Sequence, residues 1–298
     1  MRESLENLLS SAIIFEYDLP HGNTPKVTVS NAKDDCYRNG TNSDDIKELI
    51  YNGLIDYGIE ESGIDLSRLT QLHKLVLRSK IRYDESATLD TKIKYGFFGE
   101  VLLHLIISHF YKTSTLVSRG YFYNPLERSE TKGYDTFQIR NDSKGNPELW
   151  FAEVKFYGDY KQALTKIFDN VDKALSDDYL SSHFRAFVNF YDKMLPGSKA
   201  SQIVDALIND PDVNIMQLIQ QNQMTLVYPA LLICDDKNLA YDDIIKEIVE
   251  YINKKYTRVN AGNLTIPYRF FFAILPVKDS KTIKTDVIQW ISSNHPLI

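Results

Sequence analysis

Residues 133–156, GYDTFQIRNDSKGNPELWFAEVKF, decide the fold, because they contain two strand-like runs around a turn. The runs GYDTFQIR (133–140) and ELWFAEVKFY (148–157) are rich in aromatic and β-branched residues, which favour strands. Between them, NDSKGNP (141–147) contains Asp, Ser, Gly, Asn and Pro, the residues typical of turns. The pattern predicts a β-hairpin.

The register of this hairpin is expected to bring two carboxylates together. If residues equally far from Lys144 pair, Asp135 lies directly opposite Glu153, with Cβ atoms about 5 Å apart. Carboxylates at that distance repel unless a divalent cation lies between them, and Mg²⁺ and Mn²⁺ prefer oxygen ligands. Because side chains alternate along a strand, Glu153 and Lys155 share a face, whereas Val154 points to the other. The pattern predicts a site for a metal ion, a water molecule and a phosphate.

A buried glutamate is expected in the most apolar helix of the chain. This helix is predicted over 91–112, where KYGFFGEVLLHLIISHFY is apolar at nearly every position. Glu100 is the only acidic residue between Thr91 and Tyr111. A buried carboxylate is costly unless it is paired or bound to a metal. If this helix packs on the hairpin, Glu100 can reach the same cation.

The rest of the chain predicts alternating helices and strands. We expect strands over 11–19 and 26–30, a helix from Ser43 to about Tyr57 and another beginning at Asp65. Further elements are expected as a strand over 116–123, helices over 159–222, and a strand–helix–strand–helix order over 225–235, 241–256, 266–277 and 285–293. Such alternation is typical of a sheet covered by helices. The expected fold class is therefore α/β (α+β), a mixed sheet flanked by helices, with an N-terminal segment of residues 1–85 attached to a domain of residues 86–298.

Composition limits the classes of function. No run of 18 or more apolar residues occurs, and the first 20 residues lack a basic leader, so neither a membrane span nor a signal peptide is expected. Two distant cysteines, Cys36 and Cys234, suit a reducing compartment, and we expect a cytoplasmic protein. The net charge is −6, which is unlike that of a free-standing nucleic-acid binder. The nearest approach to a basic patch is formed by Lys74, Arg78, Lys80, Arg82, Lys92 and Lys94, set against Asp84, Glu85 and Asp90.

Several common catalytic motifs are absent from the sequence. It contains no HExxH, Walker A loop, GxGxxG or GxSxG, which argues against zinc peptidases, P-loop NTPases, dinucleotide-binding enzymes and serine hydrolases. His104 and His109 are interpreted as hydrogen-bonded core residues. An acid-x-Lys triplet alone means little, since Glu130-Thr131-Lys132 also fits it, but Glu153 lies inside an apolar run. The alternative interpretation is a structural ion pair between Lys155 and an acid.

The order of these residues resembles the PD-(D/E)XK nucleases, which place a glutamate on a helix, an aspartate on a strand and acid-x-Lys on the next strand. Glu100, Asp135 and Glu153-Val154-Lys155 stand in that order. By resemblance, Asp135 and Glu153 would hold Mg²⁺ (or Mn²⁺), assisted by the Val154 carbonyl and by Glu100. Lys155 would position and help to deprotonate the attacking water, or neutralise the phosphate. Gln162, on the helix after the second strand, would be a further substrate contact.

A second resemblance covers much of the chain and rests on five segments. They are GFFGEVLLHLII (96–107), GYDTF (133–137), ELWFAEVKF (148–156), LVYPALLICDD (226–236) and YRFFFAILPV (268–277). Together they are similar to the HamA family, the nuclease subunits of Hachiman antiphage defence systems. The resemblance implies a metal-dependent DNA nuclease that works with a HamB-like superfamily-2 helicase, which senses aberrant DNA and restrains the nuclease. The alternatives are a non-catalytic interaction subunit that retains the nuclease fold, and a restriction or repair nuclease.

Overall fold

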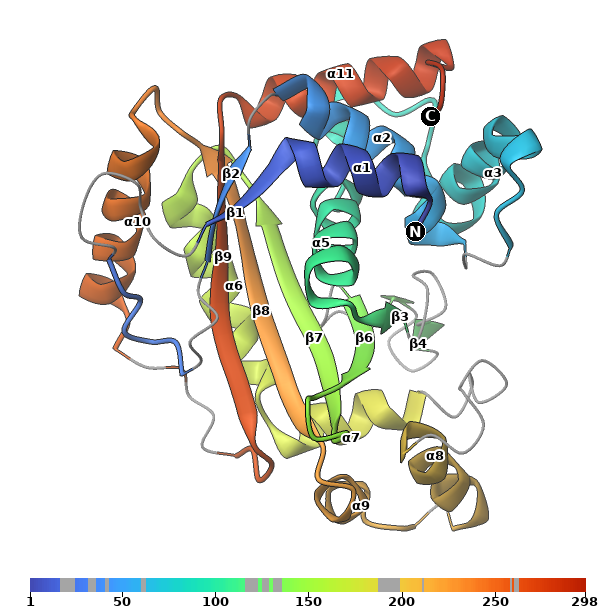
Figure 1. Ribbon diagram of the computed structural model, residues 1–298, viewed down its shortest axis with the longest axis vertical. Helices are drawn as coiled ribbons and strands as arrows, with labels where there is room; N and C mark the ends of the chain where they lie inside the picture. The colour runs from blue at the N-terminus through green and yellow to red at the C-terminus, as the bar shows by residue number, and fades with distance from the viewer. Residues whose placement is uncertain are drawn as a thin grey trace.

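The chain folds around a mixed sheet of seven strands (Figure 1). The computed structural model describes residues 1–16, 25–31, 36–40, 43–59, 63–115, 123–124, 129–130, 136–186, 199–210, 212–257, 259 and 263–298. Across the sheet, the strands lie in the order β1 (Ile13–Glu16), β2 (Cys36–Gly40), β9 (Tyr268–Val277), β8 (Thr225–Asp235), β7 (Pro147–Phe156), β6 (Thr136–Asn141) and β3 (Ser114–Thr115). Two further strands, β4 (Tyr123–Asn124) and β5 (Ser129–Glu130), pair with each other. The sheet is mixed because β2, β9, β8 and β7 run parallel, whereas β1, β6 and β3 are antiparallel to their neighbours.

The three long central strands are apolar because both of their faces are covered. Every residue of β8 except its first and last is buried, and β9 is buried from Phe270 to Val277. Parallel strands covered on both faces read as continuous apolar runs rather than as alternating ones, as TLVYPALLICD does here. The predicted fold class, a mixed sheet flanked by helices, is confirmed, and the arrangement is consistent with a nuclease-like core.

The predicted hairpin is present with the predicted register. Thr136 pairs with Ala152, and the pairing continues to Asn141 and Pro147, so residues equally far from Lys144 face each other. The turn is closed by Asp142, whose Oδ1 accepts hydrogen bonds of 2.8 Å from the backbone N–H groups of Lys144 and Asn146. Gly145 takes a left-handed φ of 80°, which glycine adopts without a steric cost. The turn chemistry thus fixes which residues of the two strands meet.

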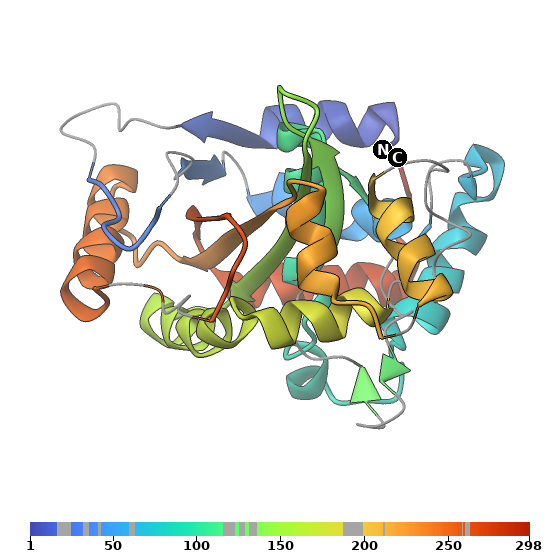
Figure 2. The same ribbon diagram turned by 90° about the horizontal axis from the view of Figure 1, so that it is seen from below.

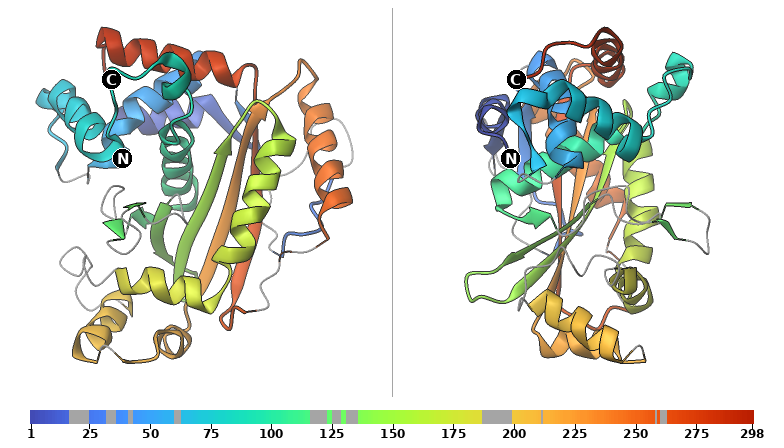
Figure 3. Two further views of the ribbon diagram at one scale, coloured as in Figure 1. Left: turned by 180° about the vertical axis from the view of Figure 1, so that it is seen from behind. Right: turned by 90° about the vertical axis from the view of Figure 1, so that its right-hand side faces the viewer.

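Helices cover the two faces of the sheet. One face carries α1 (Glu3–Ala12), α2 (Ser43–Gly58), α5 (Phe97–Tyr111) and α11 (Ser280–Ser293), whose apolar residues share a core with Trp150 and Val154. The opposite face carries α6 (Tyr160–Ala174) and α10 (Tyr241–Lys255), which pack on Phe151 and Ala230. Viewed along the strands, Figure 2 shows α1 and α6 on opposite sides of the sheet. Figure 3 shows α6 lying along the strands on the side that is hidden in Figure 1.

Shorter elements complete the fold. Between α2 and α5 lie η2 (Leu66–Arg68), α3 (Leu69–Val76), the π-helical turn η3 (Leu77–Ile81) and α4 (Leu89–Lys92). The helical region expected over 159–222 holds, besides α6, the helices α7 (Asp177–Ala186), α8 (Lys199–Asn209) and α9 (Ile215–Gln221). The later order of β8, α10, β9 and α11 is the predicted one. The helix expected over 91–112 is interrupted at residues 93–96, which separate α4 from α5.

The N-terminal predictions needed correction. Helix α1 was not predicted, and the strand expected over 11–19 is observed as β1. The strand expected over 26–30 is wrong, because the backbone of this segment bonds to a side chain of α10 instead of to a strand. Asn253 accepts the backbone N–H of Thr28 at 2.8 Å and donates its amide to the Lys26 carbonyl at 2.7 Å. Most of the strand expected over 116–123 lies outside the described residues.

Residues 1–85 share their core with the rest of the chain. Strand β2 pairs with β9, and Leu5, Leu9 and Leu54 belong to the same apolar cluster as Phe271 and Leu275. The expected division at residue 85 stays a prediction, and in the described residues the two segments build one sheet and one core.

Gly99 lets helix α5 approach the hairpin closely. A Cβ atom at Gly99 would lie 2.9 Å from Cγ2 of Val154 and 3.4 Å from Cβ of Phe156. Contacts under 3 Å are not tolerated without movement of one partner. The Val154 side chain therefore points to α5, which leaves Glu153 and Lys155 on the other face of β7.

The Gly99→Ala substitution should lower the free energy of unfolding by up to about 2 kcal/mol. Overpacking costs about 1–3 kcal/mol, against a gain of about 1 kcal/mol in helix propensity. In a Val154→Ala background the contact disappears, and the same substitution should become stabilising by about 1 kcal/mol. Urea denaturation of the wild type, the two single variants and the double variant measures both effects. An equal effect of Gly99→Ala in both backgrounds would contradict the proposed contact.

Candidate active site on the hairpin

Glu153 and Lys155 lie side by side on β7, on the face that α6 covers. Their neighbours on β8 are the apolar residues Ala230 and Leu232. Glu153 is 2% exposed, and its Oε1 accepts a hydrogen bond from the Lys155 ammonium group. A charged carboxylate in such a place needs a partner, because burial without one is costly. The predicted common face of Glu153 and Lys155 is thus observed, with the amine against the carboxylate.

Asn170 of α6 is a second partner of Glu153 that the sequence did not predict. Its Nδ2 donates to Oε1 of Glu153 at 2.7 Å. The buried side chains of Leu164, Ile167 and Val171 pack helix α6 on the sheet, and this packing places Asn170 next to Glu153. The only signal in the sequence is a polar residue next to this apolar stripe, which is common on amphipathic helices. The contact orients the Glu153 carboxylate from a different element of the fold.

Glu100 is buried, as predicted, but the contacts of the described residues hold it elsewhere. It is 5% exposed in the first turn of α5, and its Oε2 accepts a hydrogen bond of 2.7 Å from the Tyr57 hydroxyl of α2. Its neighbour Gly99 packs on Val154, so α5 lies on the face of β7 opposite to Glu153. Participation of Glu100 in a common site stays a prediction.

The two remaining predicted site residues are Asp135 and Gln162. Asp135 lies outside the described residues, although the register that places it opposite Glu153 is observed from Thr136 onward. Gln162 is exposed on α6, two turns before Asn170 and thus about 12 Å from it along the helix axis. Gln162 lies on the helix that supplies a Glu153 partner, and its contact with substrate stays a prediction.

Comparison with known protein families gives a match over nearly the whole chain. Residues 14–291 match the family model described as HamA. The chain belongs to the HamA family. HamA is a component of Hachiman, so the chain is an antiphage defence protein of a system that has partner proteins. No match was found among the curated proteins or among the solved structures.

The donor atoms of the hairpin face suit a hard metal ion in this HamA-family chain. Glu153 offers carboxylate oxygen, the ligand type that Mg²⁺ and Mn²⁺ prefer. Within the ranges that the structure describes, no three His, Cys, Asp or Glu side chains are grouped so as to hold a metal ion. Asp135, the second predicted ligand, lies outside those ranges.

His104 of α5 is a core residue, in agreement with its interpretation from the sequence. It is buried, and its Nδ1 lies 3.1 Å from Nε2 of Gln138 on β6. Gln138 in turn accepts a hydrogen bond from the Thr113 hydroxyl. Burial lowers the pKa of His104 to about 4, so the imidazole is neutral at neutral pH. The network ties α5 to the first strand of the hairpin and gives His104 a structural role.

A second lysine, Lys284 of α11, binds the end of β7 on the opposite face. Its Nζ donates to the Phe156 carbonyl at 2.6 Å and lies 4.6 Å from the Phe156 ring centroid. Burial lowers the pKa of Lys284 to about 8. The sequence did not single out this residue. Its contact holds the strand end that follows Lys155.

A membrane crossing is not built into the described helices. None of them combines the length with the apolar character that crossing a membrane requires.

Proposed function

We propose that this HamA-family chain is a Mg²⁺- or Mn²⁺-dependent nuclease that hydrolyses phosphodiester bonds of DNA on the hairpin face of Glu153 and Lys155. The observation that carries the proposal is a buried carboxylate and an amine that contact each other on one face of β7, with Asn170 donating a hydrogen bond to the carboxylate. The direct neighbours of these two groups on β8, Ala230 and Leu232, are apolar. The pattern is that of PD-(D/E)XK nucleases, which the sequence resembles.

Each residue has a role in the proposed reaction. Glu153 and Asp135 would hold the metal ion, with the Val154 carbonyl and Glu100 as assisting ligands. The bound ion would stabilise negative charge on the phosphoryl oxygens. Lys155 would orient the attacking water and take part in its deprotonation, because its ammonium group lies on the same face as the carboxylate. Asn170 would keep the Glu153 carboxylate in position while Lys155 moves to the water or the phosphate.

The proposed partners follow from the family and from the charge. The net charge of −6 is unlike that of a free-standing DNA binder. A HamB-like superfamily-2 helicase would deliver DNA to the site and would restrain the nuclease until aberrant DNA is present. The proposed place of action is the cytoplasm, where phage DNA is exposed.

The test is metal-dependent digestion of circular and linear DNA by the full chain, with and without a HamB-like helicase. The wild type should cut DNA with Mg²⁺ or Mn²⁺, and EDTA should stop the reaction. Glu153→Gln keeps the shape and the amide contacts of the side chain but removes its charge, so cleavage should fall by at least about a hundredfold. Thermal unfolding of both proteins shows whether the fold is retained.

The same experiment separates the proposal from its main rival. In a non-catalytic subunit, Glu153 and Lys155 would form a structural ion pair only, with Asn170 as its hydrogen-bond donor. Glu153→Gln would then change stability but leave any DNA cleavage by the complex at the wild-type rate. That result, with a folded variant, would remove the assigned site from the proposal.

A further inference from the structure

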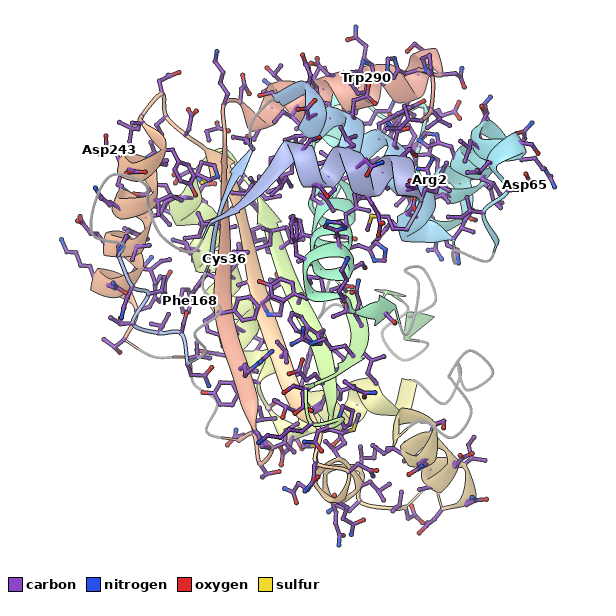
Figure 4. The ribbon with its side chains drawn as sticks, in the orientation of Figure 1. Arg2, Cys36, Asp65, Phe168, Asp243 and Trp290 are labelled. Atoms are coloured by element: carbon purple, nitrogen blue, oxygen red, sulfur yellow. The ribbon has the colours of Figure 1, made fainter. Side chains whose placement is uncertain are left out.

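A cleft with a basic lining opens between α3, η3 and the end of α11, away from the hairpin. Its volume is about 350 Å³. Helices α3 and α11 both pack on α2, on the opposite side of the sheet from α6. In Figure 1, α3 lies at the periphery, and in Figure 4 Asp65 marks this region and Trp290 marks the neighbouring α11. The cleft is therefore separate from the site of Glu153 and Lys155.

Three cationic side chains line this cleft. Lys74 and Arg78 are four positions apart and share one face of the helical segment, and both are exposed. Lys92 faces them from α4, where its Nζ donates to the Glu85 carbonyl at 2.7 Å. Glu85 contributes the one acidic side chain of the lining. In the described part of the chain, neither Lys74 nor Arg78 forms an ion pair, so their charges are available to a ligand.

Tyr83 also lines this cleft, and its hydroxyl is buried. The residue is 9% exposed, and its ring lies 5.3 Å from Nζ of Lys92. Arg82, with a left-handed φ of 54°, ends η3, and the N–H of Tyr83 then bonds to the Leu77 carbonyl at 2.9 Å. Within the described residues, the Tyr83 hydroxyl has no hydrogen-bond partner. A buried polar group without a partner is unusual and calls for a ligand or water.

The protonation states of the cleft suit an anion. Burial raises the pKa of Tyr83 to about 12, so its hydroxyl remains a hydrogen-bond donor at neutral pH. His73, which also lines the cleft, has its pKa lowered to about 4 by burial and is neutral. The lining of the cleft thus has three cationic side chains and one neutral hydrogen-bond donor, but a single carboxylate. The segment 69–94 has six basic and three acidic residues in a chain with a net charge of −6.

We propose that this cleft binds phosphate groups, with Arg78, Lys74 and Lys92 supplying charge and the Tyr83 hydroxyl donating a hydrogen bond to a phosphate oxygen. Arginine and lysine are the residues that proteins use for such ligands, and a charge-assisted hydrogen bond from a tyrosine adds direction. The phosphate can belong to a nucleic-acid backbone or to a small phosphate such as a nucleotide. The proposal does not rest on the proposed nuclease activity.

Binding to the full chain tests the proposal, with EDTA present so that no cleavage occurs. A fluorescein-labelled single strand and its duplex report backbone binding by anisotropy, and calorimetry with ATP and with inorganic phosphate reports binding of small phosphates. Arg78→Ala and Lys92→Ala should each lower the affinity for the ligand that binds by about tenfold, because a hydrogen bond to a charged group contributes about 1.5–3 kcal/mol. Tyr83→Phe removes only the hydroxyl and should lower the same affinity by about threefold to tenfold.

Arg68→Ala is the matched control for Arg78→Ala. Arg68 is exposed at the end of η2, ten positions before Arg78, and does not line the cleft. Its removal should change affinity by less than about twofold, as expected for a distant surface charge. Loss of DNA binding in the three cleft variants identifies a backbone site, and loss of ATP or phosphate binding alone identifies a small-molecule site. Equal effects of Arg68→Ala and Arg78→Ala, an unchanged Tyr83→Phe, or no binding by the wild type would each overturn the proposal.

Discussion

The Lys155→Ala variant is expected to lose DNA cleavage almost completely, by about 10²- to 10⁴-fold. A positioned group that transfers a proton contributes a factor of this size, and so does a donor that stabilises the developing charge. Lys155 is the amine that contacts Glu153 on the covered face of β7, and its side chain is 18% exposed, so it is partly accessible to solvent. The assay is digestion of plasmid DNA with Mg²⁺ under the conditions in which the wild type is active.

The control for this variant is Lys278→Ala. Lys278 is exposed just beyond β9, and the substitution makes the same change of charge away from the hairpin. Its cleavage rate should stay within about twofold of the wild type, as for a surface change away from a site. Lys155→Arg separates two roles, because arginine keeps the charge but does not give up its proton. A normal rate in a folded Lys155→Ala variant would be incompatible with the assigned site.

The Asp56→Ala variant is expected to lose about 3–5 kcal/mol of stability, because it leaves a buried guanidinium without its partner. Asp56 of α2 accepts hydrogen bonds of 2.8 Å from both the backbone N–H and the Nε of Arg2. The two side chains are only 3% and 4% exposed. Arg2 also donates to the Asn52 carbonyl at 2.7 Å, so the pair joins the start of α1 to α2.

Chemical denaturation at neutral pH measures this loss, and Asp169→Ala provides the comparison. Asp169 pairs with Lys166 at 3.7 Å on the surface of α6, where both side chains are more than half exposed. Exposed pairs contribute less than about 1 kcal/mol, so this variant should unfold nearly as the wild type does. Equal stability of the two variants would show that the Arg2–Asp56 pair contributes no more to the free energy of unfolding than a surface pair.

The hairpin was predictable from the sequence because its determinants are local. Turn residues between two strand-like runs set the register, and the alternation of side chains then set the faces of Glu153, Val154 and Lys155. Helix α10, whose buried residues Ile244, Ile248 and Ile252 recur at helical spacing, was predictable for the same reason. Information within about ten residues was sufficient for these elements.

Contacts between distant elements were not predictable in this way. Asn170 meets Glu153 only because α6 packs on the sheet, and Glu100 meets Tyr57 because α2 lies beside α5. The segment 26–30 has strand-like residues, but Asn253 satisfies its backbone and removes the need for a strand partner. In each case the contacting residue lies many positions away in the sequence, so no local sequence pattern predicts the contact.

The closed turn from Asp142 to Asn146 restricts how the length of this loop can change during evolution. Loss or gain of one residue that slips the pairing would exchange the two faces of a strand, sending Glu153 toward α5 and Val154 toward α6. An added pair of residues, one on each strand, would lengthen the hairpin and leave both faces as they are. Parity of length is therefore constrained at this loop together with Asp142 and Gly145, which form the turn.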